Sequence, residues 1–252
     1  MQKQKNTVFS PQVTQKLDQL RIKLFADGAV LDEMKHWHAN PYIKGFTTNP
    51  SLMRAANINN YQTFAHKVLD IIRHHPISFE TFADEMDEME TQARHIATWG
   101  KNVNIKIPIT NTQGVFTGRV IENLSADGIP LNITAIMTVE QVAAAVQCIK
   151  NNTPAIISVF SGRIADSGID PMSIMKKAAD LLRAHDNIEL LWASPREIFN
   201  IFQADEAGCD IITVQPSILQ KLSLLGKDLN DYSLETVKQF YFDARSANYT
   251  LK

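Results

Sequence analysis

Cysteine is scarce in this sequence, with Cys148 and Cys209 the only two in 252 residues. So few cysteines exclude a scaffold of several disulfides and are typical of a protein from a reducing compartment. Long apolar runs are also missing, since no stretch approaches the roughly 20 residues that a membrane-spanning helix needs. The basic start MQKQKN is not followed by the apolar segment of a signal peptide. We therefore expect a cytoplasmic protein that does not enter a membrane.

An excess of charge of one sign is absent as well. The 25 Lys and Arg residues against 27 Asp and Glu residues give a formal net charge of −2. Without a basic surplus the chain lacks the charge that holds a phosphate backbone, so nucleic acid is not an expected partner. No Gly-rich dinucleotide-binding or phosphate-binding loop is found either. These absences direct attention to chemistry that needs neither nucleotide nor nucleic acid.

The sequence does contain a regular alternation of short apolar segments and longer helical patterns. Such alternation predicts a parallel sheet covered by helices, and eight strand–helix units are enough to close a barrel. We predict an α/β fold: a single (β/α)8 TIM barrel with additional terminal helices, in one domain of residues 1–252. An open doubly wound sheet is the alternative. The expected strands are residues 22–26, 43–47, 77–82, 103–109, 131–136, 155–160, 188–193 and 210–214.

The fourth predicted strand carries a lysine on the face that should point into the barrel. Side chains alternate between the two faces of a strand, and every second residue from Val103 to Ile109 is apolar and suited to packing against helices. Lys106 therefore points inward. A charged lysine is costly to bury, and burial favours the neutral amine, which is a nucleophile. The alternative is a lysine paired with an acid for structure alone.

The same alternation sends polar side chains from other strands toward the C-terminal end of the interior. The interior of a purely structural barrel would be mostly Val, Ile and Leu. Polar residues on so many successive strands therefore predict an active site. Its expected members, besides Lys106, are Asp27, Asn49, Ser78, Glu80, Asn132, Thr134 and Ser158, with Phe160 on the same face. Strands seven and eight are apolar on both faces, so alternation does not assign their inward residues.

Two arginines follow the ends of late strands. Arg163 comes after the sixth strand, and Arg196 follows the seventh, just after Ser194. Barrel enzymes often bind phosphate at loops late in the barrel, and a guanidinium fork suits a phosphate dianion. We therefore expect a phosphate site here. A surface arginine or a salt bridge is the alternative for each of the two.

Seven segments, in this order, resemble the transaldolase family over nearly the whole chain. GFTTNPS and the segment with the inward lysine are the specific ones. The segments are FADGA (25–29), GFTTNPS (45–51), ISFE (77–80), NIKIPIT (104–110), LNITA (131–135), SVFSGRI (158–164) and WASPR (192–196). The resemblance implies a transferase that moves a dihydroxyacetone unit from a ketose phosphate, such as fructose 6-phosphate or sedoheptulose 7-phosphate, to an aldose phosphate. It implies no metal and no cofactor.

The resemblance also assigns roles to the matching positions. Lys106 would form a Schiff base with the ketose, and Asp27 would take the C4 hydroxyl proton when the C3–C4 bond breaks. Glu80 and Thr134 would hold and activate a catalytic water. The dihydroxyacetone part would be held by Asn49, Asn132 and Ser158, beside Phe160, and the phosphate by Arg163, Ser194 and Arg196.

Two positions separate this reading from a related lyase. Aldolases of the superfamily that release free dihydroxyacetone usually carry glutamine at the position of Glu80 and tyrosine at that of Phe160. Three residues near the expected phosphate site depart from the family: Val159 replaces proline, Ser161 replaces valine, and Pro195 replaces phenylalanine. The alternatives are thus a fructose-6-phosphate aldolase-like lyase or a specialised transaldolase of sugar biosynthesis rather than of the pentose phosphate pathway.

A non-catalytic sugar-phosphate-binding barrel is the third hypothesis, and it would be favoured by loss of the lysine or the acids, all of which are present. Small members of the superfamily form rings of five or ten subunits, so we expect a homo-oligomer. The terminal helices, residues 231–248 especially, would cap the barrel or pack on a neighbouring subunit.

Overall fold

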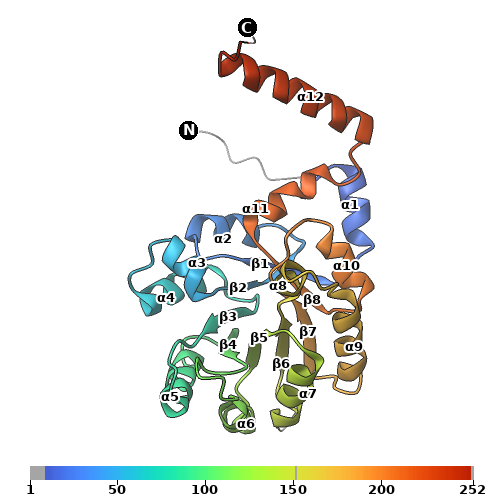
Figure 1. The fold of residues 1–252 in the computed structure, drawn as a ribbon. Helices are drawn as coiled ribbons and strands as arrows, with labels where there is room; N and C mark the ends of the chain where they lie inside the picture. The colour runs from blue at the N-terminus through green and yellow to red at the C-terminus, as the bar shows by residue number, and fades with distance from the viewer. Residues whose placement is uncertain (1–8, 151, 251–252) are drawn as a thin grey trace. The chain divides into compact units, whose positions relative to one another are not determined.

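The computed structural model describes residues 9–150 and 152–250, so the basic start of the sequence lies outside the described residues. Contacts divide the chain into two compact units (Figure 1). One comprises residues 20–220, and the other joins residues up to 19 with those from 221 onward. A single domain over residues 1–252 stays a prediction.

The first unit is a closed barrel of eight parallel strands in sequence order, with helices outside it (Figure 1). This confirms the predicted (β/α)8 fold, and each observed strand lies within two residues of the expected one at either end. The strands are β1 (Lys23–Asp27), β2 (Ile43–Thr47), β3 (Ile77–Glu80), β4 (Val103–Pro108), β5 (Leu131–Ile136), β6 (Ala155–Val159), β7 (Ile188–Trp192) and β8 (Ile211–Val214).

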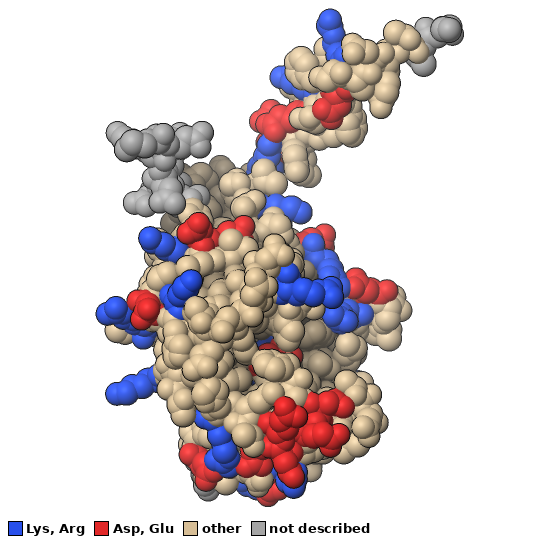
Figure 2. All heavy atoms as spheres, turned by 90° about the vertical axis from the view of Figure 1, so that its left-hand side faces the viewer, with Lys and Arg blue, Asp and Glu red and all other residues tan. Residues whose placement is uncertain are grey.

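The helices of this unit begin and end where local sequence signals favour it. Thr138 and Gln141 form a reciprocal capping box at the start of the seventh helix. Asp87 and Glu88 occupy the first turn of the fifth, where the helix dipole favours negative charge; acidic side chains gather low on the face drawn in Figure 2, where this helix lies. The helices are α2 (Leu31–His38), α3 (Pro50–Ala55), α4 (Tyr61–Ile71), α5 (Met86–Ala97), α6 (Gly118–Ala126), α7 (Val139–Cys148), α8 (Ser161–Asp166), α9 (Met172–Leu182), α10 (Asn200–Glu206) and α11 (Pro216–Leu219).

The interior of the barrel contains an apolar cluster and, toward the C-terminal ends of the strands, polar side chains. Strands β1, β6, β7 and β8 supply a buried cluster of Phe25, Ile156, Leu191, Ala193 and Ile211. This cluster assigns the inward residues of β7 and β8, which alternation alone left open. Polar inward side chains come from β3 to β5 and from the C-terminal ends of β1, β2, β6 and β8, where they line a cavity that is available for chemistry.

Alternation fails at one point of strand β5. The ladder with β6 shifts register between Ile133 and Ile136, and Ala135 has a φ of 62°. A bulge adds one residue to a strand and changes which face the following side chain occupies. Ala135 therefore lines the central cavity, whereas strict alternation predicted that it would face the helices.

The second unit contains α1 (Pro11–Asp18), a 3-10 helix (Gln220–Leu224) and α12 (Leu229–Ser246). Helix α1 starts at residues that favour a helix N-terminus, with Ser10 accepting from the amide of Val13 and with Pro11 at the first position. Helix α12 has no buried residue along its 18 residues. None of the helices within the described residues is long and apolar enough to cross a membrane.

Candidate active site

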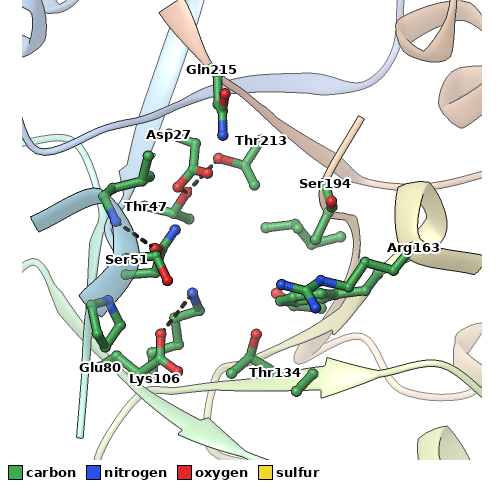
Figure 3. Close-up of a pocket in the computed structure, with 18 of the residues that line it drawn as sticks. Asp27, Thr47, Ser51, Glu80, Lys106, Thr134, Arg163, Ser194, Thr213 and Gln215 are labelled. Carbon is green, nitrogen blue, oxygen red and sulfur yellow. Dashed lines mark hydrogen bonds and ion pairs between the residues drawn. The ribbon is translucent and has the colours of Figure 1, made fainter. Parts of the chain in front are cut away.

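A cavity of about 500 Å³ opens at the C-terminal ends of the barrel strands. Its lining comes from the last residues of the strands and from the loops that follow them, because parallel strands all end at the same mouth. Figure 3 shows side chains from opposite sides of the barrel pointing toward one another across it. Every predicted site residue lines this cavity except Ser78 and Asn132.

Lys106 lies at the floor of the cavity and is only 6% exposed. Its Nζ is 3.0 Å from Oε2 of Glu80 and donates to the backbone carbonyl of Thr48 at 3.1 Å. Glu80 and Lys106 are register partners on β3 and β4, which explains why the two side chains meet. The amine is thus within proton-transfer distance of one carboxylate.

Tyr61 holds the backbone beside this ion pair. Its hydroxyl donates to the carbonyl of Glu80 at 3.0 Å, and its ring packs edge-on against Phe79 and Trp99. Burial raises the pKa of the Tyr61 hydroxyl well above its usual range, so the phenol remains a donor. The sequence analysis did not predict a role for Tyr61, because this residue lies on α4 rather than on a strand.

Asp27 ends β1 and approaches the cavity from the side opposite β5. Its Oδ1 accepts a hydrogen bond of 2.7 Å from Oγ1 of Thr47, its register partner on β2. Burial raises the pKa of the Asp27 carboxyl above its ordinary value, while nearby Lys106 and the bond from Thr47 act to lower it and Glu80 acts to raise it. A carboxyl held in this way can exchange a proton with a bound substrate.

Asn132 lies below the cavity rather than on its wall. Its side chain is fully buried, donates to Ser78 at 2.9 Å and accepts from Ser158 at 2.6 Å. The three side chains link β3, β5 and β6 across the barrel. Asn132 therefore orients Ser158, which does line the cavity, and the contact of Asn132 with substrate stays a prediction.

Thr134 and Asn49 present unused hydrogen-bonding groups to the cavity. Oγ1 of Thr134 is buried and has no hydrogen-bond partner among the described residues. Asn49 caps α3 by accepting from the amide of Leu52 at 2.9 Å, with Pro50 at the first helical position. Since the oxygen of Asn49 is engaged in the cap, its NH2 group is the part that can donate to a ligand.

The two arginines differ in their surroundings. Arg163 lies on the far side of the cavity from Lys106 (Figure 3), with its guanidinium 5.6 Å from the centre of the Phe160 ring. Arg196 is paired through two nitrogens with the carboxylate of Asp166 on α8. Arg196 thus forms the salt bridge that was the alternative to phosphate binding. The side chains of both arginines still line the cavity.

Gly162 permits the close approach of the loops that carry these arginines. A Cβ at this position would lie 1.6 Å from the carbonyl oxygen of Ser194. Ser194 itself has a φ of 61°, an uncommon conformation for serine. The loops after β6 and β7 therefore pack backbone to backbone, which sets the spacing between Arg163 and Arg196.

Four polar residues of the lining were missed by the sequence analysis: Thr47, Ser51, Thr213 and Gln215. Thr47 and Ser51 stand inside the GFTTNPS segment, and strand alternation beside Asn49 could have found Thr47. Thr213 lies on β8, where both faces are apolar and no pattern marks the inward one. Gln215 follows the end of that strand and points into the cavity mouth (Figure 3).

Residues 24–251 match the sequence model described as Transaldolase/Fructose-6-phosphate aldolase. The chain belongs to this family. The enzyme predicted from the sequence resemblance is thereby confirmed at the level of the family. Within the described residues, no group of three or more His, Cys, Asp or Glu side chains is arranged to hold a metal ion.

Several curated relatives agree with this family assignment. A probable transaldolase of Nitrosopumilus maritimus is 27% identical over 233 residues, which cover 92% of this chain and 100% of the relative. A probable transaldolase 2 of Listeria monocytogenes is 33% identical over 202 residues, 80% of this chain and 88% of the relative. The similarity therefore extends over nearly the whole length of these relatives.

Solved structures show the same fold at low identity. A dihydrodipicolinate synthase from Rhodopseudomonas palustris superposes with a TM-score of 0.57 at 13% identity, covering 88% of this chain and 79% of the other. A putative protein of the dihydrodipicolinate synthase family from Coccidioides immitis gives 0.60 at 8% identity, covering 92% and 80%. These similarities concern the barrel fold alone.

Proposed function

We propose that this enzyme transfers a dihydroxyacetone unit from a ketose phosphate to an aldose phosphate through a Schiff base on Lys106. The observation that carries the proposal is the buried contact between the Lys106 amine and Glu80 in a cavity that Asp27 also lines. Relatives named as probable transaldolases support it. The reaction needs one amine nucleophile and two carboxylates with separate tasks, and this cavity contains that set.

Formation of the Schiff base uses Lys106 and Glu80. Glu80, 3.0 Å away, first accepts one proton from the Lys106 ammonium and leaves the amine neutral. The amine attacks the ketone carbon, and a second proton passes from the nitrogen to the former carbonyl oxygen to give the carbinolamine. The proton held by Glu80 then goes to the carbinolamine hydroxyl, which leaves as water. The unpartnered hydroxyl of Thr134 is available to hold that water. The iminium that results withdraws electrons from the neighbouring carbon–carbon bond.

Cleavage and transfer use Asp27. Its carboxylate takes the C4 hydroxyl proton, the C3–C4 electrons move to the iminium, and a shorter aldose leaves. The enamine on Lys106 then attacks the aldehyde of the acceptor, and Asp27 returns its proton to the new hydroxyl. Water hydrolyses the Schiff base and frees the product. Ping-pong kinetics follow, because the first product leaves before the acceptor binds.

Substrate binding divides between the two ends of the cavity. Asn49 and Ser158 would hold the dihydroxyacetone part near Lys106, while Asn132 acts by orienting Ser158. Arg163, with no carboxylate partner among the described residues, is the principal phosphate ligand, and Arg196 and Ser194 complete that end. Arg196 keeps guanidinium N–H groups for a phosphate while Asp166 holds its other edge.

We propose further that the enzyme is a homo-oligomer in which α12 packs on a second copy. Helix α12 exposes a run of apolar side chains that a lone chain leaves in water, among them Val237, 60% exposed, and Phe240, 68% exposed. Light scattering should give a multiple of the chain mass. Phe240→Asp should lower that mass, and the matched change Gln239→Asp on the same helix should not. A parent protein of single-chain mass would contradict the proposal. The cytoplasmic location stays a prediction.

Trapping with borohydride tests the central step. The protein is incubated with fructose 6-phosphate, reduced, and examined by intact mass and peptide mapping. We expect a three-carbon adduct on Lys106 that is absent from Lys106→Met, while the surface variant Lys44→Met keeps it. Addition of an aldose phosphate acceptor before reduction should remove the adduct. An adduct on another lysine, or none across a panel of ketoses with folded protein, would refute the role of Lys106.

Release of free dihydroxyacetone, measured with and without an acceptor, separates the transferase from the lyase. Free dihydroxyacetone released at the full rate without an acceptor would favour the aldolase. A strict requirement for the acceptor is the expected result, because Glu80 and Phe160 occupy the two positions at which the lyases usually carry glutamine and tyrosine.

A further inference from the structure

A chain of two threonine hydroxyls leads from β8 to the carboxylate of Asp27. Oγ1 of Thr213 lies 2.5 Å from Oγ1 of Thr47, and Thr47 lies 2.7 Å from Oδ1 of Asp27. The two threonines are 5% and 1% exposed. Figure 3 shows the three side chains gathered at one side of the cavity. The chain thus joins β8, β2 and β1 within the polar part of the barrel.

The number of protons in this chain decides which group donates to which. Each hydroxyl has one proton to donate. When Asp27 is ionised it can only accept, so Thr47 donates to Asp27, and Thr213 must donate to Thr47. Both hydroxyl protons are then used inside the protein. A proton on Oδ1 would reverse the chain, and no group among the described residues is in place to accept from Thr213.

We propose that Thr213 is a positioning residue that acts through Thr47 to keep Asp27 a carboxylate with Oδ1 occupied and Oδ2 directed to the substrate. The identity of the substrate hydroxyl rests on the proposed function. The effect of the hydroxyl chain on the ionisation of Asp27 does not, since it involves groups of the protein alone. A hydroxyl that itself accepts a hydrogen bond is a stronger donor, and such cooperativity favours the ionised end of the chain.

The charges around Asp27 explain why such support is needed. Lys106 on β4 lowers the pKa of the carboxyl, whereas Glu80 on β3 and burial raise it. Arg163 and Arg196 line the opposite end of the cavity, and α11 beside β1 carries no charged residue. Lys106 is shared with Glu80 through their ion pair, so the two threonines are the neutral groups that oppose the effect of burial on Asp27.

Titration of Asp27 by NMR tests the proposal on the full chain. Aspartate labelled with carbon-13 at the side-chain carboxyl gives a resonance that Asp27→Asn removes and thereby identifies. We expect Thr213→Val to raise the pKa of Asp27 by roughly half a unit or more, because Thr47 loses its donor. Thr47→Val should raise it further, since the direct hydrogen bond is lost. Thr213→Ser keeps the hydroxyl and should titrate as the parent does.

Coincident titrations of the parent and Thr213→Val would overturn the proposal. So would a shift in Thr213→Ser equal to that in Thr213→Val, which would assign the effect to packing of the methyl group. Thr213→Ala provides a second variant without the hydroxyl should the valine not fold, and circular dichroism checks each protein. Thr213→Ala is expected to raise the pKa of Asp27 as Thr213→Val does. An unshifted titration of Asp27 in Thr213→Ala would equally overturn the proposal.

Kinetics separate failure of this proposal from failure of the proposed function. In Thr213→Val the acid limb of kcat/KM should move to higher pH by the shift seen in NMR, while borohydride still traps a substrate adduct on Lys106. If no ketose forms an adduct in the parent, the proposed function fails and the Asp27 titration still decides the role of Thr213. If the parent transfers the three-carbon unit but the acid limb stays in place, the role of Thr213 fails and the proposed function stands.

Discussion

Replacement of Gly162 by alanine should damage the phosphate end of the cavity while leaving Lys106 reactive. The new Cβ would lie 1.6 Å from the carbonyl oxygen of Ser194 and 3.2 Å from Nε of Arg196. Real Cβ atoms essentially never come closer than 3.0 Å to such a neighbour, so the loops must separate by about 1.4 Å. A backbone carbonyl cannot move aside as the end of a flexible side chain can, so the displacement reaches Ser194 and Arg196.

The expected losses of stability and activity follow from that displacement. Overpacking of this kind costs about 1–3 kcal/mol of unfolding free energy, which lowers Tm by roughly 2–10 °C for a chain of this size. Misplacement of a binding group by about 1 Å can cost about 100-fold in rate. We therefore expect kcat/KM for fructose 6-phosphate to fall by roughly 10–100-fold, with a much smaller fall for unphosphorylated dihydroxyacetone donors such as fructose.

The control is Gly128→Ala, at the opposite end of the barrel. Gly128 has a φ of 72° and open space around its Cα, so alanine there costs about 1 kcal/mol through backbone strain without touching the cavity. Differential scanning calorimetry and steady-state kinetics on both donors compare the two variants. If Gly162→Ala lost no more activity on the phosphorylated donor than Gly128→Ala does, the reasoning about the loop contact would be refuted.

Four further predictions concern the reaction and the fold. Glu80→Gln leaves Lys106 without its proton acceptor and should lower kcat roughly 100-fold or more in steady-state assays; an unchanged kcat would exclude proton transfer by Glu80. Asp27→Asn should still form the Schiff base but not cleave it, so borohydride should trap the whole ketose phosphate on Lys106, and a three-carbon adduct would show that cleavage does not need Asp27. Because the pKa of Asp27 is raised, the carboxylate is lost below a midpoint higher than the ordinary aspartate value, and kcat/KM in the parent should fall as the pH drops through that midpoint. Ala135→Val places a β-branched residue at a φ of 62° and should lower Tm by several degrees in a thermal melt, whereas Ala135→Gly should not.

Much of this enzyme could be predicted from the sequence because the relevant signals are local. The succession of short apolar segments and helical patterns identified the eight strands, and alternation along single strands identified the inward faces of β3, β4 and β6. It also predicted that Lys106 and Glu80 point into one interior, and their 3.0 Å contact agrees. A lysine between isoleucines on a strand with one fully apolar face is informative by itself, since burial of its charge is costly.

Tertiary structure decided whatever depends on a partner distant in the sequence. Strand β8 is apolar on both faces, so only closure of the barrel against β1 assigned Thr213 to the interior beside Thr47. Asn132 was predicted to contact substrate, yet hydrogen bonds to Ser78 and Ser158 engage it below the cavity. The pairing of Arg196 with Asp166 likewise joins the loop after β7 to helix α8, 30 residues apart in the sequence.

The bulge at Ala135 marks the boundary between the two kinds of information. Periodicity specifies which residues share a face only while the backbone remains regular, and a register shift between β5 and β6 ends that regularity within one residue. The sequence by itself determined the order of the elements, the family and the chemical groups of the site. The distances between those groups depend on register, loop packing and closure of the sheet, which arise only when all eight strands are assembled.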